Sequence, residues 1–172
     1  MRKKLSLFIL LMLSLNLFSQ PTIRVFAFEQ ENLPGTRPSG VTDENGKRVQ
    51  KAAAKKNYFI FLSFDKAYSI APAQIFIRNK AFTTKTMIIK ETPVQHINNN
   101  IPARPEKITL VPATKNKVLE LQLDETPVEN KKTGATQKLT DKNDVVIVYL
   151  WKNKKYFLTV KKLKKLEPVA NE

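Results

Sequence analysis

The chain has 172 residues and no cysteine, which excludes disulfide bonds, thiolate chemistry and the acylated cysteine of a bacterial lipoprotein. Its four glycines are scattered, so we expect no glycine-rich phosphate loop and no nucleotide partner, and one histidine cannot build a multi-histidine metal site. Thirty basic and 15 acidic residues give a net charge of +15, which favours anionic partners unless it only reflects a lysine-rich composition.

The N-terminal segment has the three parts of a secretory signal peptide. Residues 2–4 are positive, Leu5–Phe18 is apolar apart from three residues, and Ser19 is a small residue suited to cleavage before Gln20. The apolar run is shorter than the roughly 20 residues of a stable span, and an uncleaved anchor is the alternative. We expect cleavage near Ser19, a periplasmic or secreted mature protein, and no later membrane span.

Residues 20–172 predict one all-β domain. Valine, isoleucine, phenylalanine and tyrosine occur in short runs between proline, asparagine, glycine and lysine, which is typical of strands and turns. About eight strands without a long helical pattern indicate a single antiparallel β-sandwich of immunoglobulin-like architecture, or an open barrel. The Cys-Trp-Cys spacing of true immunoglobulin domains is absent, so the likeness concerns architecture only.

The first part of this domain predicts two strands around an irregular segment. Thr22–Phe28 alternates as a strand, and residues 29–56 are expected to be irregular, with a hairpin signal at Asn45-Gly46. Tyr58–Phe64 is apolar almost throughout, which predicts a central strand buried on both faces.

The middle of the chain predicts two pairs of strands, the first joined by a tight turn at Asn79-Lys80. The pairs are Gln74–Arg78 with Phe82–Lys90, and Lys107–Val111 with Lys117–Leu123. Long loops are expected at Gln95–Glu106 and Glu129–Asn143, because both are polar.

The last two strands, Val145–Trp151 and Tyr156–Val160, predict a hairpin. A two-residue loop at Asn153-Lys154 or a four-residue loop would set Trp151 opposite Tyr156. We expect one face to be buried, namely Val145, Ile147, Tyr149, Trp151, Tyr156, Leu158 and Val160. The other face is expected to be a partly exposed apolar patch beside lysines, formed by Val146, Val148, Leu150, Phe157, Thr159 and Lys161.

Catalytic patterns are weak, so we expect no enzyme, no cofactor and no metal. The mature chain has three serines, Ser39, Ser63 and Ser69, and none lies in a Gly-x-Ser-x-Gly elbow. His96 is expected to be a solvated loop histidine. Two carboxylate pairs, Asp124 with Glu125 and Asp141 with Asp144, are typical of turns, and a hydrolase that uses such a pair is a distant alternative.

Aromatic residues and lysines gather near the C-terminus, where 161–172 forms a basic tail. Rings beside ammonium groups can stack on sugars or bases and pair with phosphate. The alternatives are that Trp151 packs in the core and that the tail closes a sheet edge. The candidate binding surface comprises Trp151, Lys152, Lys154, Lys155, Tyr156, Lys161, Lys162, Lys164 and Lys165.

Two functions follow from these features. The first is an exported, non-enzymatic interaction module that docks to another cell-envelope protein. The second is a binder of an anionic polymer (lipopolysaccharide, acidic glycan or extracellular DNA) through the lysine-rich hairpin. Removal of residues 1–19 leaves 27 basic and 15 acidic residues, so export preserves a net charge of +12. Salt dependence separates the two functions, because only polymer binding weakens steeply as ionic strength rises.

Overall fold

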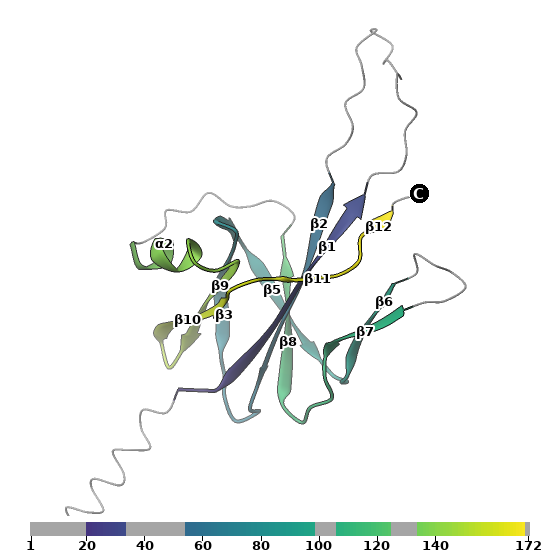
Figure 1. The fold of residues 1–172 in the computed structure, drawn as a ribbon. Coiled ribbons are helices and arrows are strands. Elements are labelled where there is room, and N and C mark those ends of the chain that lie inside the picture. Colours follow the sequence, from purple (N-terminus) through teal and green to yellow (C-terminus); the bar gives the residue numbers. More distant parts are fainter. Residues whose placement is uncertain (1–19, 34–53, 99–105, 125–133, 171–172) are drawn as a thin grey trace, which may run out of the picture.

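The computed structural model describes residues 20–33, 54–98, 106–124 and 134–170, which are mostly β-strand with one short helix (Figure 1). The expected signal peptide and the expected hairpin at Asn45-Gly46 lie outside these residues. The elements are β1 (Ile23–Leu33), β2 (Lys55–Phe64), β3 (Ala71–Ile77), β4 (Lys80–Phe82), β5 (Thr84–Ile89), β6 (Val94–Asn98), β7 (Glu106–Val111), β8 (Lys117–Leu123), α2 (Gly134–Thr140), β9 (Val145–Trp151), β10 (Lys154–Val160), β11 (Lys164–Lys165) and β12 (Val169–Ala170).

The strands form three sheets. The largest has the order β11-β1-β2-β8-β5, with β12 also paired to β1, and the second has the order β10-β9-β3-β4. The third is the two-stranded hairpin β6-β7. β2 is central in the largest sheet, and its last five residues, Ile60–Phe64, are all buried. The prediction of a strand buried on both faces is therefore confirmed.

Hydrophobic clusters show how these sheets pack. One cluster lies between the two larger sheets and joins Leu62 of β2 to Ile75 of β3 and Ile147 of β9. A second lies on the other face of the largest sheet, where Phe61 packs with Val111 of β7. On the outer face of the second sheet, residues of β3, β4 and β9 pack with Leu139 of α2. The layers are α2, the second sheet, the largest sheet and the β6-β7 hairpin.

Several expected boundaries were wrong. β1 continues to Leu33 and β2 begins at Lys55, so part of the expected irregular segment is strand. The expected loop Gln95–Glu106 includes four residues of β6, and the expected loop Glu129–Asn143 contains α2. The added ends of β1 and β2, together with the short elements β6 and α2, are mostly polar, so they lack the apolar periodicity by which strands and helices are recognised.

Two expected pairings also differ. The turn after β3 is at Arg78-Asn79, whose φ angles of 45° and 71° are left-handed. The expected strand Phe82–Lys90 breaks at Thr83, where the chain crosses from the second sheet to the largest one. The Thr83 hydroxyl donates to the carboxylate of Asp124 at the end of β8, which fixes the crossing. β7 pairs with β6 rather than with β8, because β8 is already paired to β2 and β5.

The β9-β10 hairpin exists, but its register was wrong by two residues. The turn is Lys152-Asn153, with φ angles of 48° and 61°, and Trp151 lies opposite Lys154. A two-residue shift keeps each side chain on the same face of a strand. The expected inner face is accordingly confirmed, with Tyr149, Trp151 and Leu158 packed in the cluster between the larger sheets.

Candidate functional site

Trp151, the central aromatic residue of the expected surface, belongs to the core. Its side chain is 7% exposed. The ring of Tyr68 meets it edge-on at 6.3 Å, and the ring of Tyr156 lies 5.8 Å away. The Lys152 ammonium lies 4.7 Å from the indole centroid and covers it. The indole therefore has no open face on which a sugar or base could stack.

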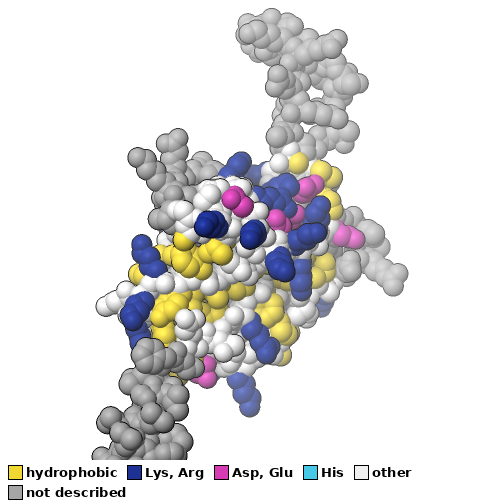
Figure 2. Space-filling model, turned by 60° about the vertical axis from the view of Figure 1, so that its left-hand side comes forward, with side chains coloured by type: hydrophobic (Ala, Val, Ile, Leu, Met, Phe, Trp, Pro, Cys, Tyr) yellow, Lys and Arg dark blue, Asp and Glu magenta, His cyan; other side chains and the backbone are white. Residues whose placement is uncertain are grey.

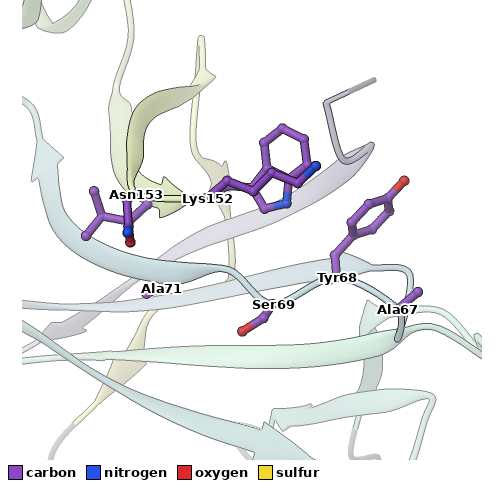
Figure 3. A pocket seen from close by; sticks show the side chains of 8 residues that line it. Ala67, Tyr68, Ser69, Ala71, Lys152 and Asn153 are labelled. Atoms are coloured by element: carbon purple, nitrogen blue, oxygen red, sulfur yellow. The ribbon is translucent and has the colours of Figure 1, made fainter. Parts of the chain in front are cut away.

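A hollow of about 640 Å³ lies beside this core residue (Figure 3). Tyr68, from the β2-β3 connection, and Lys152, from the β9-β10 turn, lie on its two sides. Its lining residues are Ala67, Tyr68, Ser69, Ala71, Leu150, Trp151, Lys152 and Asn153. One ammonium group and a mainly small or apolar lining give it little ability to select an anion.

The lysines of the expected surface divide into two exposed groups. Lys152, Lys154 and Lys155 lie at the hairpin turn, and Lys161, Lys162, Lys164 and Lys165 lie beyond the other end of β10. Lys155 and Lys161, the members of the two groups nearest in sequence, are six positions apart along this extended segment, a span of about 20 Å. Tyr156 is half-buried and stacks on Tyr149 at 5.6 Å. The nine residues therefore do not form one site.

The tail lysines lie on a strand that closes a sheet edge. β11 pairs in parallel with β1, with Lys164 opposite Phe28 and its ammonium 5.7 Å from that ring. Leu163 is buried between the two larger sheets, whereas Leu166 is buried on the opposite face of the largest sheet. The Leu166 amide donates to the Glu29 carbonyl oxygen at 2.8 Å. Residues 163–170 of the tail thus run along the outer edge of β1, and we call this segment the strap.

The candidate catalytic residues have structural partners. His96 is not a solvated loop residue, because it lies half-buried in β6, with its Nε2 3.1 Å from Gln30 Nε2 and its ring 5.3 Å from Phe59. Ser63 is buried. Asp144 accepts a hydrogen bond from the Leu163 amide at 3.0 Å.

The remaining carboxylates of the expected pairs also have local roles. Asp141 accepts a hydrogen bond from the Gln137 side chain, and Asp124 accepts one from Thr83. Glu125 lies outside the described residues. Within the described ranges, no group of three His, Asp or Glu residues could hold a metal, and no helix has the length and apolar character of a membrane span.

A charged cluster on the second sheet's side of β1 is structural in character. Glu29 is 2% exposed, and Arg78 donates to its Oε1 at 2.7 Å. Asp144 lies 4.0 Å from the same guanidinium, and Lys56 lies 3.8 Å from Glu29 Oε2. The hydrogen bond to Glu29 raises the pKa of Arg78. Burial raises the pKa of the neighbouring Tyr58.

The β5 edge was missed by sequence reasoning. β5 is the last strand of the largest sheet and pairs only with β8 among the described residues. Its register with β8 runs from Thr84 to Ile89 without a bulge. Met87 is 44% exposed and Ile88 is 59% exposed. Within the part of the chain that the structure describes, β5 therefore presents an unpaired backbone edge together with apolar side chains.

A basic hollow of about 420 Å³ adjoins the C-terminal end of β5. Its lining residues are Lys66, Ile88, Ile89, Lys90, Thr92, Thr114, Lys115, Asn116 and Lys117. Thr92 and Thr114 are hydrogen-bonded to each other, and no carboxylate lines the hollow. Four lysines from separate connections and strands thus line one hollow together with apolar Ile88 and Ile89. We call these four lysines the lysine cluster.

Space-filling representation shows the wider charge distribution. On the side that carries α2 and β10, Lys and Arg side chains surround hydrophobic ones, and acidic side chains are fewer (Figure 2). The expected apolar patch on this side is mostly covered, because Val146 and Val148 are buried against Leu139, while Phe157 stays 39% exposed.

The chain matches no protein-family model, no curated protein and no solved structure.

Proposed function

We propose that this protein is an exported, non-enzymatic docking module for another cell-envelope protein, built as a β-sandwich of immunoglobulin-like architecture. The observation that carries the proposal is the open edge of β5. An unpaired strand edge offers a row of amide and carbonyl groups to which an extended segment can add as a new strand. Residues 1–19, with their signal-peptide pattern, support the export part of the proposal.

β5 has few of the features that normally block such pairing. Native proteins protect sheet edges with proline, bulges, very short strands or charged side chains. β5 has six residues, no proline and a regular register, and lysine is its only protective residue type. Exposed apolar side chains on the same strand supply the hydrophobic contact of a docking surface.

The opposite edge of the same sheet provides an internal comparison. There the strap seals β1, with Leu163 and Leu166 buried on opposite faces of the sheet. The protein thus closes one edge of its largest sheet with its own chain, and the described residues leave the other edge without a strand. This asymmetry favours β5 as the edge that receives a partner.

A binder of anionic polymer is the second candidate, and the lysine cluster favours it. Stacking of a polymer on Trp151, which that hypothesis included, is not supported, because Trp151 is buried beneath Lys152. Stacking on bases or sugars would need an accessible ring. Docking to a protein therefore accounts for more of the observed surface.

The test compares Ile88→Lys with Ile97→Lys. Both side chains are exposed, on β5 and β6 respectively, so each substitution should change stability by about 0.5 kcal/mol or less. A cross-linked partner from the envelope fraction should be captured by wild type and by Ile97→Lys but lost with Ile88→Lys. That partner should also slow hydrogen exchange of β5 amides. Equal capture by both variants, or β5 amides that exchange unchanged in the complex, would contradict docking at this edge.

A further inference from the structure

Within the described part of the chain, no carboxylate forms a salt bridge with a lysine of the lysine cluster. None of Lys66, Lys90 and Lys115 is in a salt bridge within the described part of the chain, and Lys117 has only the Phe64 ring, 5.9 Å from its ammonium. The nearby carboxylate of Asp65 accepts the Ala67 amide at 2.8 Å. Like charges that converge on one hollow repel each other, and an anion placed there would relieve that repulsion.

The cluster is placed so that a strand added to β5 would pass it. Ile88 and Ile89 belong both to β5 and to the lining of the hollow, and Lys90 follows directly. A segment that pairs with β5 would run along Met87 and Ile88 and reach the hollow at one end. Apolar contact along the strand and anion contact at its end therefore belong to one surface.

Charge also decides against a second copy of this chain as the occupant. Antiparallel pairing of two β5 strands would place Lys85 of one copy beside the lysine cluster of the other, at both ends of the paired strands. The net charge of +12 that remains after removal of residues 1–19 adds a general repulsion between copies. Complementarity points instead to a partner with negative charge and apolar residues.

We propose that the docked segment is an extended peptide that alternates apolar residues along β5 and carries carboxylates where it meets the lysine cluster. This inference rests on the proposed function, because it assigns the chemistry of the segment that β5 receives. The carboxylates act as selectivity determinants: they discriminate against neutral or basic strands that could otherwise pair with the same backbone edge.

The experiment is a selection from a random ten-residue peptide display library. The baits are full-length mature wild type, the edge variant Ile88→Lys, the cluster variant Lys66→Glu/Lys115→Glu, and the control Lys154→Glu/Lys155→Glu at the distant β9-β10 turn. Circular dichroism and thermal unfolding verify that each variant is folded. A milder variant, Lys66→Gln/Lys115→Gln, replaces the cluster variant if charge reversal impairs folding.

Peptides selected by wild type and by the turn control should be rich in Asp and Glu next to β-branched residues. Their affinity should fall about tenfold on the cluster variant, as expected for two partly exposed ion pairs, and the fall should shrink at high salt. They should not bind the edge variant. Peptides that depend on Ile88 but show no acidic bias would overturn this inference and leave strand docking intact. If no peptide depends on Ile88, or if the mature chain dimerises through β5, docking of a foreign strand is itself wrong.

Discussion

The guanidinium of Arg78 donates a hydrogen bond of 2.7 Å to Glu29, a carboxylate of β1 that is almost fully buried. The second oxygen of that carboxylate has no hydrogen-bond partner. Arg78 is thus the main compensation for a buried charge, and it occupies a turn position with a left-handed φ of 45°. The pair ties the β3-β4 turn to the first strand.

We expect Arg78→Ala to lower the free energy of unfolding by about 2–3 kcal/mol, because it leaves the Glu29 charge buried without its partner. The value is below that of a fully buried pair, since the Arg78 side chain is itself 39% exposed and water screens it. Urea unfolding measures the loss. Lys56→Ala is the control and should cost no more than about 1 kcal/mol, because its ammonium is 3.8 Å from Glu29. Equal losses of stability from the two substitutions would contradict the assignment of Arg78 as the main partner of Glu29.

Truncation of Trp151 and truncation of Lys152 should have very different effects on the free energy of unfolding. Trp151→Ala removes a buried ring from the cluster between the sheets and should cost about 3–5 kcal/mol. Lys152→Ala removes an exposed ammonium over that ring and should cost about 0.5–1 kcal/mol. Thermal or urea unfolding of both variants checks this. If the Trp151→Ala protein were as stable as wild type but had lost a binding activity, the indole would be a binding residue rather than a core residue.

The β9-β10 turn can be improved. Lys152 and Asn153 both have positive φ, which asparagine and glycine tolerate better than lysine does. The double substitution Lys152→Asn/Asn153→Gly should therefore stabilise the protein by about 1 kcal/mol, after the loss of the contact between Lys152 and Trp151. A midpoint of urea unfolding below that of wild type would show that the contact outweighs the strain.

Two tyrosines should contribute to alkaline sensitivity. Burial raises the pKa of Tyr58 and of Tyr149 above 10 in the folded state. The folded protein then holds these protons at a pH at which the unfolded chain releases them, so stability is unaffected below about pH 10 and falls above it. Tyr58→Phe/Tyr149→Phe should lose less stability than wild type between pH 9 and 11. Parallel pH curves for the two proteins would refute this.

The strands that could be predicted from the sequence are those whose apolar residues recur with the period of a strand or form a continuous apolar run. Tyr58–Phe64 and the faces of Val145–Trp151 could be assigned because burial on one or both sides dictates side-chain type at every position. The hairpin register could not be predicted, because Lys152 is not a typical residue for a turn position of positive φ and any even shift preserves the same faces.

The candidate site was harder to predict than the fold, for a physical reason. Whether Met87 and Ile88 form an exposed edge depends on which strand lies beside β5, and that follows from the crossing at Thr83 rather than from local sequence. Similarly, Lys66 and Lys115 line one hollow only because the connection after β2 and the connection before β8 lie at the same end of these two paired strands. The aromatic and basic residues near the C-terminus were conspicuous in sequence, but burial of Trp151 and the length of β10 divide them.

The strap along β1 also affects when the strands of the largest sheet can finish pairing during folding. β1 is the first strand of the described residues, yet its outer edge is paired by residues 164–165 and 169–170, and the Gln30 side chain donates to the Glu167 carbonyl oxygen. A chain that emerges from its N-terminus exposes this edge throughout synthesis. β1 therefore becomes fully paired only when nearly the whole chain is available, so incomplete chains carry an open strand edge that a chaperone can recognise.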